Sequence, residues 1–363
     1  MSRKKILFLS SWYPTDVNPT NADFVQRHAQ AVALLNDVSV LHVIYNSNIS
    51  SRIQIHTSES NGIFEYIVYF KLPSVLRICK PLYYIYLYYR NIHTISKLRG
   101  NPDVIHANIL YPIGLIALLT KLIHSIPYVC SEHWSGYLHE SQVSISPFRL
   151  FCTKLIAKRC NYIIPVSEFL MNSMKSRGIL GNYEIVPNVV ETSIFNATEN
   201  HKQKIHTILH VSTLKDSVKN ISGILRALAH VAQIRTDFVL EVASENSPEY
   251  MLQYAKELQI ENHVRFIGYK NRPELAKKLS ECSFFILFSN YETFSCVIVE
   301  SFAAGKPVIS SNTVGVKNYI TPERGIVVSR QNELELAQAI ITMLDTYSNY
   351  NAQDLHAFAD ANF

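Results

Sequence analysis

Residues 292–300 read Glu-Thr-Phe-Ser-Cys-Val-Ile-Val-Glu and lie between the apolar run 284–288 and the turn Gly305-Lys306-Pro307. A short aromatic and branched run, followed by a polar loop and a helical stretch, is typical of a parallel strand entering a helix. Ligands bind at the carboxyl ends of such strands, where the first amides of the helix favour negative charge. The stretch therefore predicts an α/β domain with an anion site at the helix start.

Within this stretch the two carboxylates are predicted to have different environments. Thr293 and Ser295 are expected to cap the helix, which leaves backbone amides of the segment 294–297 available to an anion. Glu292 would lie in the loop before the helix and Glu300 roughly two turns inside it. One carboxylate would then face a reacting group while the other binds a more distant hydroxyl.

The length and composition describe a globular protein of two domains. The chain has 363 residues, of which 48% are apolar and 17% charged, so two cores of ordinary size are expected. It contains no uncharged apolar stretch of about 18 residues, and its first residues run directly into a predicted strand at 6–9. The six cysteines have neither C-x-x-C spacing nor the pattern of a small secreted domain. We therefore expect reduced thiols in a cytoplasmic protein.

The net charge of +5 is divided unevenly between the two halves. Residues 1–186 carry 18 Lys and Arg against 10 Asp and Glu, whereas the remainder carries 16 against 19. The stretch between Glu65 and Asp103 holds six basic residues and no acidic one, and the stretch between Glu140 and Glu168 holds four and none. A basic first half predicts contact with an anionic acceptor or membrane surface, peripheral at the inner face of the plasma membrane.

Strands and helices alternate in both halves, which predicts parallel sheets covered by helices. Strands are expected at 6–9, 38–43, 104–106, 128–130 and 162–166, and again at 208–211, 238–242, 264–268, 284–288 and 308–311. The polar stretch 191–204 interrupts the pattern. We therefore predict a first domain at 1–190, a linker at 191–204, a second domain at 205–345 and a tail at 346–363. No strand is followed by G-x-G-x-x-G, so a dinucleotide cofactor is not expected.

The E-x7-E pair, together with Ser289-Asn290-Tyr291 before it and the Gly-Lys-Pro turn after it, resembles the donor site of GT-B glycosyltransferases of family 4. The resemblance implies two doubly wound Rossmann-like domains facing each other across a cleft. It implies that Glu292 lies by the donor sugar and that Glu300 hydrogen-bonds the ribose. The segment between them would bind the donor through Thr293, Phe294, Ser295, Cys296 and Val297.

Two further segments resemble the diphosphate contacts of that family. The first loop, Pro19-Thr20-Asn21-Ala22-Asp23-Phe24, has Ala22 where the family usually has Gly, and Ala is disfavoured if the position needs a positive φ. The segment from His210 to Asn220 has Thr213 in place of the family's Arg. Lys219 keeps the family's position, and Lys215 is the candidate to supply the missing cation. An ammonium group and helix-end amides together would hold a diphosphate.

The predicted acceptor side lies in the first domain. Segments 103–108 and 132–137 both close strands and resemble the family's cleft rim. Together with Glu292 and Lys219, His133 is one of three candidate catalytic residues. An aromatic side chain next to polar groups, such as Trp134, suits the apolar face of a sugar. The candidate acceptor contacts are His106, Glu132 and Trp134.

The resemblance implies a metal-independent retaining glycosyltransferase of the hexosyltransferase type, active in polysaccharide or glycolipid synthesis. The sequence has no Asp-x-Asp and no His, Cys or carboxylate cluster with metal-ligand spacing. The implied co-substrate is a nucleotide diphosphate sugar, with no cofactor and no nucleic acid, and the acceptor would be lipid-linked or a glycan. Two alternatives stay open: a nucleotide-sugar 2-epimerase, and a catalytically inactive sugar-nucleotide-binding homologue.

Two further segments carry expectations of their own. Residues 82–89 read Leu-Tyr-Tyr-Ile-Tyr-Leu-Tyr-Tyr between Lys80 and Arg90, which fits either a helix packed into the core or an interfacial surface, or both on opposite faces. Family members typically continue past a segment like 356–363 into a helix that crosses back to the first domain. The sequence ends at Phe363, so that crossover helix is expected to be truncated.

Overall fold

The computed structural model describes residues 3–18, 21–199, 201 and 203–363. Pro19 and Thr20 of the predicted first loop, and positions 200 and 202 of the predicted linker, lie outside the described residues. The chain divides into two compact domains, Met1–Val189 and Val190–Phe363. The predicted end of the first domain at residue 190 therefore lies beside the observed division, and the linker region belongs with the second domain.

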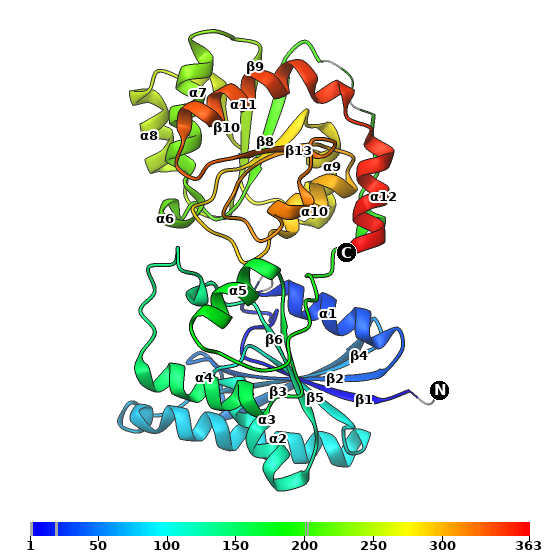
Figure 1. Cartoon of the computed structure of the whole chain (residues 1–363). Helices are drawn as coiled ribbons and strands as arrows, with labels where there is room; N and C mark the ends of the chain where they lie inside the picture. Colours follow the sequence, from blue (N-terminus) through cyan, green and yellow to red (C-terminus); the bar gives the residue numbers. More distant parts are fainter. Residues whose placement is uncertain (1–2, 19–20, 200, 202) are drawn as a thin grey trace. The chain divides into compact units, whose positions relative to one another are not determined.

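The first domain is built on a seven-stranded sheet with the order β3-β4-β2-β1-β5-β6-β7 (Figure 1). Its strands are β1 (Lys5–Ser10), β2 (Asp37–Tyr45), β3 (Ile53–Ser60), β4 (Ile63–Phe70), β5 (Val104–Asn108), β6 (Tyr128–Glu132) and β7 (Tyr162–Pro165). All neighbouring strands pair in parallel except β3, which pairs antiparallel with β4 at the edge. Neither strand of this hairpin was predicted from the sequence. Strand β3 is polar and exposed and gives no apolar pattern, whereas β4 is largely buried and its apolar run was missed.

Helices cover both faces of this sheet. They are α1 (Asp23–Ala33), α2 (Lys80–Arg99), α3 (Ile113–His124), α4 (Pro147–Arg159) and α5 (Glu168–Ser176). Alternate residues of β2 face opposite ways, so Val38 and Val40 pack in the cluster under α1 while Val43 lies on the α2 side, where its amide donates to Tyr88 Oη at 3.2 Å. Figure 1 shows α2, α3 and α4 side by side on one face, with α1 on the other.

The second domain has a six-stranded, fully parallel sheet with the order β10-β9-β8-β11-β12-β13. Its strands are β8 (His206–Val211), β9 (Phe238–Ala243), β10 (Val264–Phe266), β11 (Phe284–Leu287), β12 (Val308–Ser311) and β13 (Gly325–Val328). Its helices are α6 (Asp216–Lys219), α7 (Ile221–Ala232), α8 (Glu249–Glu257), α9 (Arg272–Glu281), α10 (Cys296–Ala303), α11 (Glu333–Thr346) and α12 (Ala352–Asn362). Short 3-10 turns complete the fold: η1 (Ser74–Cys79), η2 (Ser135–Tyr137), η3 (Thr192–Ile194), η4 (Glu261–His263), η5 (Lys317–Tyr319) and η6 (Tyr347–Asn349).

The predicted tail at 346–363 contains η6 and α12 as ordered structure. Helix α12 packs against α10 of the same domain, and the carbonyl of Phe363 accepts a hydrogen bond from the amide of Val190 at 3.2 Å. The ring of Phe363 also lies 5.9 Å from that of Phe294 and 5.2 Å from that of Tyr319. These contacts make 346–363 part of the second domain.

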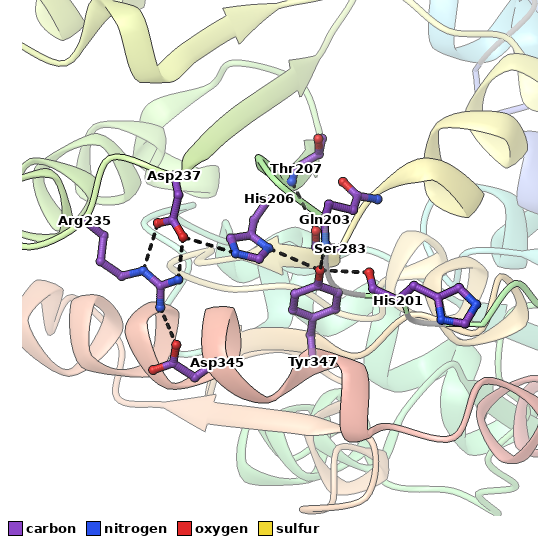
Figure 2. A network of polar contacts seen from close by, with 9 residues as sticks. All are labelled: His201, Gln203, His206, Thr207, Arg235, Asp237, Ser283, Asp345 and Tyr347. Atoms are coloured by element: carbon purple, nitrogen blue, oxygen red, sulfur yellow. Dashed lines mark hydrogen bonds and ion pairs between the residues drawn. The ribbon is translucent and has the colours of Figure 1, made fainter.

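A polar network fastens the chain entering β8 to the rest of the second domain (Figure 2). Tyr347 Oη donates to the carbonyl of His201 at 3.0 Å, accepts from the amide of Gln203 at 2.9 Å and lies 3.2 Å from His206 Nδ1. His206 Nε2 is 3.3 Å from Asp237, whose carboxylate also takes two hydrogen bonds from Arg235. These Arg235 hydrogen bonds lower the pKa of Asp237 to about 2.

The strand order reverses once in each sheet, and both reversals matter for ligand binding. In the first sheet the chain leaves β1 toward β2 on one side, while β5 lies on the other; in the second, β8 and β11 are the corresponding pair. In open α/β sheets, ligands bind outside the carboxyl ends of strands at such reversal points. The loops after β1 and β5, and those after β8 and β11, are therefore where the architecture places a site.

Ala22, immediately before α1, adopts the left-handed conformation with φ 53° and ψ 44°. An L-residue pays about 1–2 kcal/mol in this region because its Cβ crowds the following carbonyl, whereas Gly does not. The position therefore does require a positive φ, the condition under which Ala was expected to be disfavoured. Ala22 is nevertheless partly buried and packs against the apolar cluster under α1.

We expect Ala22→Gly to raise the free energy of unfolding by about 0.5–1 kcal/mol, since relief of the strain exceeds the extra entropy of Gly in the unfolded chain. The matched control is Ala31→Gly on the same helix, where the backbone is helical and Gly should lower stability by about 1 kcal/mol. Urea unfolding followed by circular dichroism measures both. Equal destabilisation by the two changes would show that Ala22 carries no strain.

Candidate functional site

The reversal point of the second sheet brings Lys219 and Glu292 together. Lys219 ends α6, in the loop after β8, and Glu292 lies in the loop after β11. Lys219 Nζ forms an ion pair with Glu292 Oε1, and Ser289 Oγ donates to the same oxygen at 3.0 Å. The two charged side chains are 20% and 14% exposed, so the pair is largely but not completely removed from water.

Hydrogen bonds between the two loops fix this pairing. The amide of Asn290 donates to the carbonyl of Val218 at 2.7 Å, and Asn290 Nδ2 donates to the carbonyl of Ser217 at 3.1 Å. Asn220 adopts a left-handed conformation that ends α6, and α7 begins at the next residue. The ammonium group is therefore held by its backbone as well as by its carboxylate partner.

Glu292 is held from its other side by the loop after β12. Its amide donates to the carbonyl of Thr313 at 3.1 Å, and its carbonyl accepts from the amide of Gly315 at 3.1 Å. Ser311 Oγ donates to the carbonyl of Ser289 at 2.6 Å. The loops after three strands, β8, β11 and β12, thus hold the Lys219–Glu292 pair at the carboxyl edge of the sheet.

Helix α10 follows this loop and corrects two expectations. Ser295 is its N-cap residue and its side chain makes no capping hydrogen bond, so the predicted capping by Ser295 is wrong, whereas that by Thr293 stays a prediction. The helix starts at Cys296, which puts the buried Glu300 just over one turn inside rather than two. The first amides of α10 have no carbonyl four residues earlier within the helix, as expected of a helix start.

The remaining predicted donor residues lie around this constellation. Phe294 is buried, Val297 is partly buried, and Thr213 and Lys215 are exposed in the loop between β8 and α6. His210, the residue that precedes this loop on β8, is buried, with its Nδ1 2.8 Å from the carbonyl of Ile286 and its Nε2 2.7 Å from Ser212 Oγ. His210 therefore joins β8 to β11 rather than pointing toward a ligand.

In the first domain, Glu132 organises two loops at the carboxyl edge of the sheet. Its Oε2 accepts from the amide of Leu110 at 2.9 Å, and its Oε1 accepts from the amides of His133 and Trp134 at 3.0 and 2.9 Å. Burial raises the pKa of this carboxyl to about 7, although the three amides and Arg149 act in the opposite direction. The contacts of Glu132 are with the backbone, so it positions the segments after β5 and β6.

His133 and Asn108 have polar side-chain atoms that meet the distance and angle limits of a hydrogen bond with no partner among the described residues. Both ring nitrogens of His133 and both side-chain polar atoms of Asn108 are buried in this way. The His133 ring lies 4.6 Å from that of Phe24 and 5.8 Å from that of His28. Burial lowers its pKa well below the usual value, and His28 and His106 lower it further, while Asn188 raises it. Buried unpaired polar groups of this kind are natural ligand contacts.

The other two predicted acceptor residues differ in environment. His106 is buried on β5, with its Nε2 2.6 Å from Ser131 Oγ and its ring 4.3 Å from Phe8. Trp134 is half-buried, and the guanidinium of Arg149 stacks 3.5 Å from the centre of its ring. A Cβ on Gly136 would approach the Trp134 indole to 2.2 Å, so this ring position requires glycine.

Comparison with protein families identifies the chain. Residues 191–357 match the model of glycosyl transferases group 1, and residues 37–194 match that of glycosyltransferase family 4. The chain belongs to the group 1 glycosyltransferases. The resemblance noted in the sequence is thereby confirmed.

Among curated relatives of this glycosyltransferase, one from Campylobacter jejuni is 29% identical over 208 residues, covering 54% of each chain. It is an N-acetylgalactosamine-N,N'-diacetylbacillosaminyl-diphospho-undecaprenol 4-alpha-N-acetylgalactosaminyltransferase. The alpha-monoglucosyldiacylglycerol synthase of Streptococcus pneumoniae is 22% identical over 283 residues, covering 72% of this chain and 64% of the relative. The matches thus span about half to two thirds of these relatives.

Solved structures confirm the GT-B fold of two Rossmann-like domains. Sucrose-phosphate synthase from Thermosynechococcus elongatus superposes with a TM-score of 0.75 at 18% identity, covering 99% of this chain and 95% of its own. HepE of Anabaena, solved in complex with UDP and glucose, superposes with a TM-score of 0.71 at 17% identity, covering 99% and 96%. The same protein has been solved with UDP-glucose.

Sequence reasoning missed several residues that shape this glycosyltransferase's candidate site. Ser289 and Asn108 lay within quoted motifs but were not assigned to the site, and Arg149 was counted only as a charge. Asn108 is the last residue of β5, at a reversal point of the sheet, a position that could have identified it. No helix in the described ranges is both long and apolar enough to cross a membrane.

Buried histidines make this fold sensitive to acid. His42 on β2 lies with its Nδ1 2.7 Å from the carbonyl of Ser10, and burial lowers its pKa from 6.5 to about 4. Because the folded pKa lies below the unfolded one, His42 contributes stability that is present above pH 6.5 and lost as pH falls toward 4. Between pH 7 and pH 5 the loss amounts to about 2 kcal/mol.

We therefore expect His42→Asn, whose amide can still donate to Ser10, to flatten the fall in unfolding free energy between pH 7 and pH 5 by about that amount. The control is His93→Asn at an exposed position of α2, which should leave the pH slope unchanged. Urea unfolding at a series of pH values measures both slopes. An unchanged slope in His42→Asn would contradict a neutral, buried imidazole.

Proposed function

We propose that this protein is a retaining glycosyltransferase that moves a sugar from a nucleotide diphosphate donor to a hydroxyl acceptor. The observation that carries the proposal is the Lys219–Glu292 pair at the β8/β11 reversal point, next to the start of α10. A cation, a carboxylate and helix-end amides at one strand edge are the groups that a diphosphate-linked sugar requires. The relative solved with UDP and UDP-glucose supports this choice of donor.

In this proposal the donor diphosphate binds between Lys219 and the first amides of α10, the segment of Thr293, Phe294, Ser295, Cys296 and Val297. Glu300 accepts hydrogen bonds from the ribose, and Glu292 orients the sugar. Thr213 and Lys215 border the diphosphate from the loop after β8. No metal ion or cofactor is required, since protein cations and amides carry the charge.

Transfer would break the bond between the anomeric carbon and the diphosphate oxygen, with the electron pair leaving on the nucleoside diphosphate. The acceptor hydroxyl attacks the same face of the sugar, and its proton passes to the departing phosphate oxygen, so that configuration is retained. Lys219 and the helix-end amides stabilise the charge that develops on the leaving group. Preorganised charges of this kind need no rearrangement during the reaction.

The acceptor would bind at the carboxyl edge of the first sheet. His133 is neutral at physiological pH and would exchange hydrogen bonds with an acceptor hydroxyl, while Trp134, with the Arg149 guanidinium stacked on its ring, would border the acceptor. His106 and Glu132 shape this wall, the latter through its bonds to the backbone. Relatives that act on a diphospho-undecaprenol-linked sugar and synthesise a glucosyl lipid favour a lipid-linked or glycan acceptor, used in polysaccharide or glycolipid synthesis at the inner face of the membrane.

The exposed Thr213, which stands where the family has an arginine, favours one alternative, a homologue that binds a sugar nucleotide without transfer. A second alternative is a 2-epimerase, which would need no acceptor. Incubation with labelled nucleotide sugars, with and without lipid extract, separates the three. Transfer predicts label in a glycolipid or glycan only when acceptor is present, epimerisation predicts a changed sugar without acceptor, and an inactive homologue predicts neither.

Three substitutions test the division of roles in the donor site. We expect Lys219→Met and Glu300→Ala each to weaken UDP binding by about 1.5–3 kcal/mol, the value of a charge-assisted hydrogen bond. Glu292→Ala frees Lys219 from its ion pair, so UDP binding should stay equal or become tighter while turnover falls at least about tenfold. Calorimetric titration with UDP and an initial-rate assay measure the two effects.

The control for these changes is Glu257→Ala on the exposed side of α8, which should alter neither quantity. Melting temperatures of all variants show whether each has folded. Equal loss of UDP binding in Glu292→Ala and Glu300→Ala would refute the assignment of one carboxylate to the sugar and the other to the ribose.

A further inference from the structure

The helical face formed by η1, α2, α3 and α4 has an unusual composition. These four elements contain ten Lys and Arg and no Asp or Glu. They pack in the order α2-α3-α4 over one side of the first sheet, as Figure 1 shows. We call the outward side of these four elements the basic helical face. The ten basic residues of the four elements exceed the excess of basic over acidic residues in residues 1–186, which carry 18 Lys and Arg against 10 Asp and Glu.

Apolar side chains project outward from α2 on this face. Leu82, Tyr86 and Tyr89 recur at helical spacing and are 72%, 53% and 41% exposed, while Leu87 and Tyr88 pack inward and are fully buried. Residues 82–89 thus pack into the core on one side of α2 and form an outer surface on the other, which is the third of the possibilities that the sequence left open. In η1, Val75 and Ile78 extend the exposed apolar surface ahead of the helix.

Helix α4 repeats this arrangement at the other end of the face. Its inner side buries Ile156 and Ala157. Its outer side exposes Phe148, Phe151 and Leu155 by 67%, 65% and 41%. Between α2 and α4, helix α3 adds Leu119, Leu122 and Ile123, and the ring of Tyr89 stacks on that of His124 to join the surfaces of α2 and α3. Exposed apolar groups therefore occur on every helix of the face.

Basic groups lie among these apolar side chains. Arg90 and Lys97 are exposed on the outer side of α2, and Lys154 and Lys158 on that of α4. Within the residues that the structure describes, none of these four makes an ion pair with a carboxylate. Their charge is therefore uncompensated by the protein itself and attracts an anionic partner.

We propose that the basic helical face docks onto an anionic lipid bilayer, with the leucine, phenylalanine and tyrosine side chains entering the headgroup boundary and the lysine and arginine groups binding lipid phosphates. Tyrosine with phenylalanine and leucine suits that boundary, and a polybasic surface supplies the second signal that stable peripheral binding needs. The absence of any acidic residue on four elements favours a uniformly negative partner over a protein surface of mixed charge. The acceptor role of this membrane rests on the proposed function, whereas the docking itself does not.

Vesicle binding of the full chain tests this surface. We expect co-sedimentation with vesicles of equimolar phosphatidylcholine and phosphatidylglycerol, and binding at least about tenfold weaker to pure phosphatidylcholine. Binding to the anionic vesicles should weaken as salt rises, since exposed charges are screened over about 8 Å at physiological ionic strength. Lys154→Glu with Lys158→Glu should reduce it at least about tenfold, because each basic residue near such a surface contributes about fivefold.

A second pair of changes, Phe148→Ser with Phe151→Ser, should also weaken binding but leave its salt dependence intact, since it removes only apolar insertion. The matched control is Tyr250→Ser with Lys256→Glu on α8 of the second domain, which replaces one exposed aromatic and one exposed lysine and should have no effect. UDP titration of every variant, in the same preparations, separates this proposal from the proposed function.

Several outcomes would overturn the docking surface. Equal binding to neutral and anionic vesicles, or losses in the α8 control as large as those in the α4 variants, would do so. Binding to polyuridylate but not to vesicles would instead identify a nucleic-acid surface, and a concentration-dependent dimer abolished by the Phe148 and Phe151 changes would identify contact between two copies. If vesicle binding fails while UDP still binds, the docking surface is wrong and the proposed transfer stands.

Discussion

The proposed function of the second domain depends on the ion pair between Lys219 and Glu292. This ion pair joins the loops after β8 and β11, the two strands at which the sheet reverses its order. Because Asn290 ties one loop to the other and Thr313 ties Glu292 to a third, both charges are held in place before any ligand arrives. Removing either side chain would leave the other charge largely buried and without a partner, which is unfavourable, so each charged group holds the other in its position. A diphosphate would give Lys219 a stronger partner and leave Glu292 to the sugar.

The first domain uses burial rather than ion pairing to prepare its carboxyl edge. Glu132 directs its oxygens to three backbone amides, and this positions the segments from which His133 and Trp134 project. Burial keeps the imidazole of His133 neutral, so that one nitrogen can accept and the other donate. In the proposed function, the neutral imidazole of His133 in the first domain would suit a hydroxyl acceptor, and the ammonium group of Lys219 in the second would suit a diphosphate donor.

The sequence predicted most of the fold because apolar strands in parallel sheets form short continuous runs that are easy to recognise. The family resemblance assigned Lys219 and Glu292 to one site, and the sheet order places them at adjacent strand ends. Sequence reasoning missed the exposed edge strand β3 and also the buried, apolar strand β4, and Ser295 at the start of α10 does not make the side-chain cap that the sequence suggested. Ala22 shows a different limit, since the left-handed backbone follows from the loop's tertiary setting rather than from the residue's own preference. The unpaired polar atoms of Asn108 and His133 depend on what surrounds them, which no local pattern encodes.

The central claim is that the β8/β11 reversal point binds the diphosphate of a sugar nucleotide, and a crystal structure of the protein with UDP tests it most directly. The account predicts phosphate oxygens within hydrogen-bonding distance of Lys219 Nζ and of the first amides of α10, with the ribose hydroxyls at Glu300. It also predicts that Glu292 separates from Lys219 when the nucleotide is bound. UDP bound elsewhere on the second domain, with the Lys219–Glu292 pair intact, would contradict it.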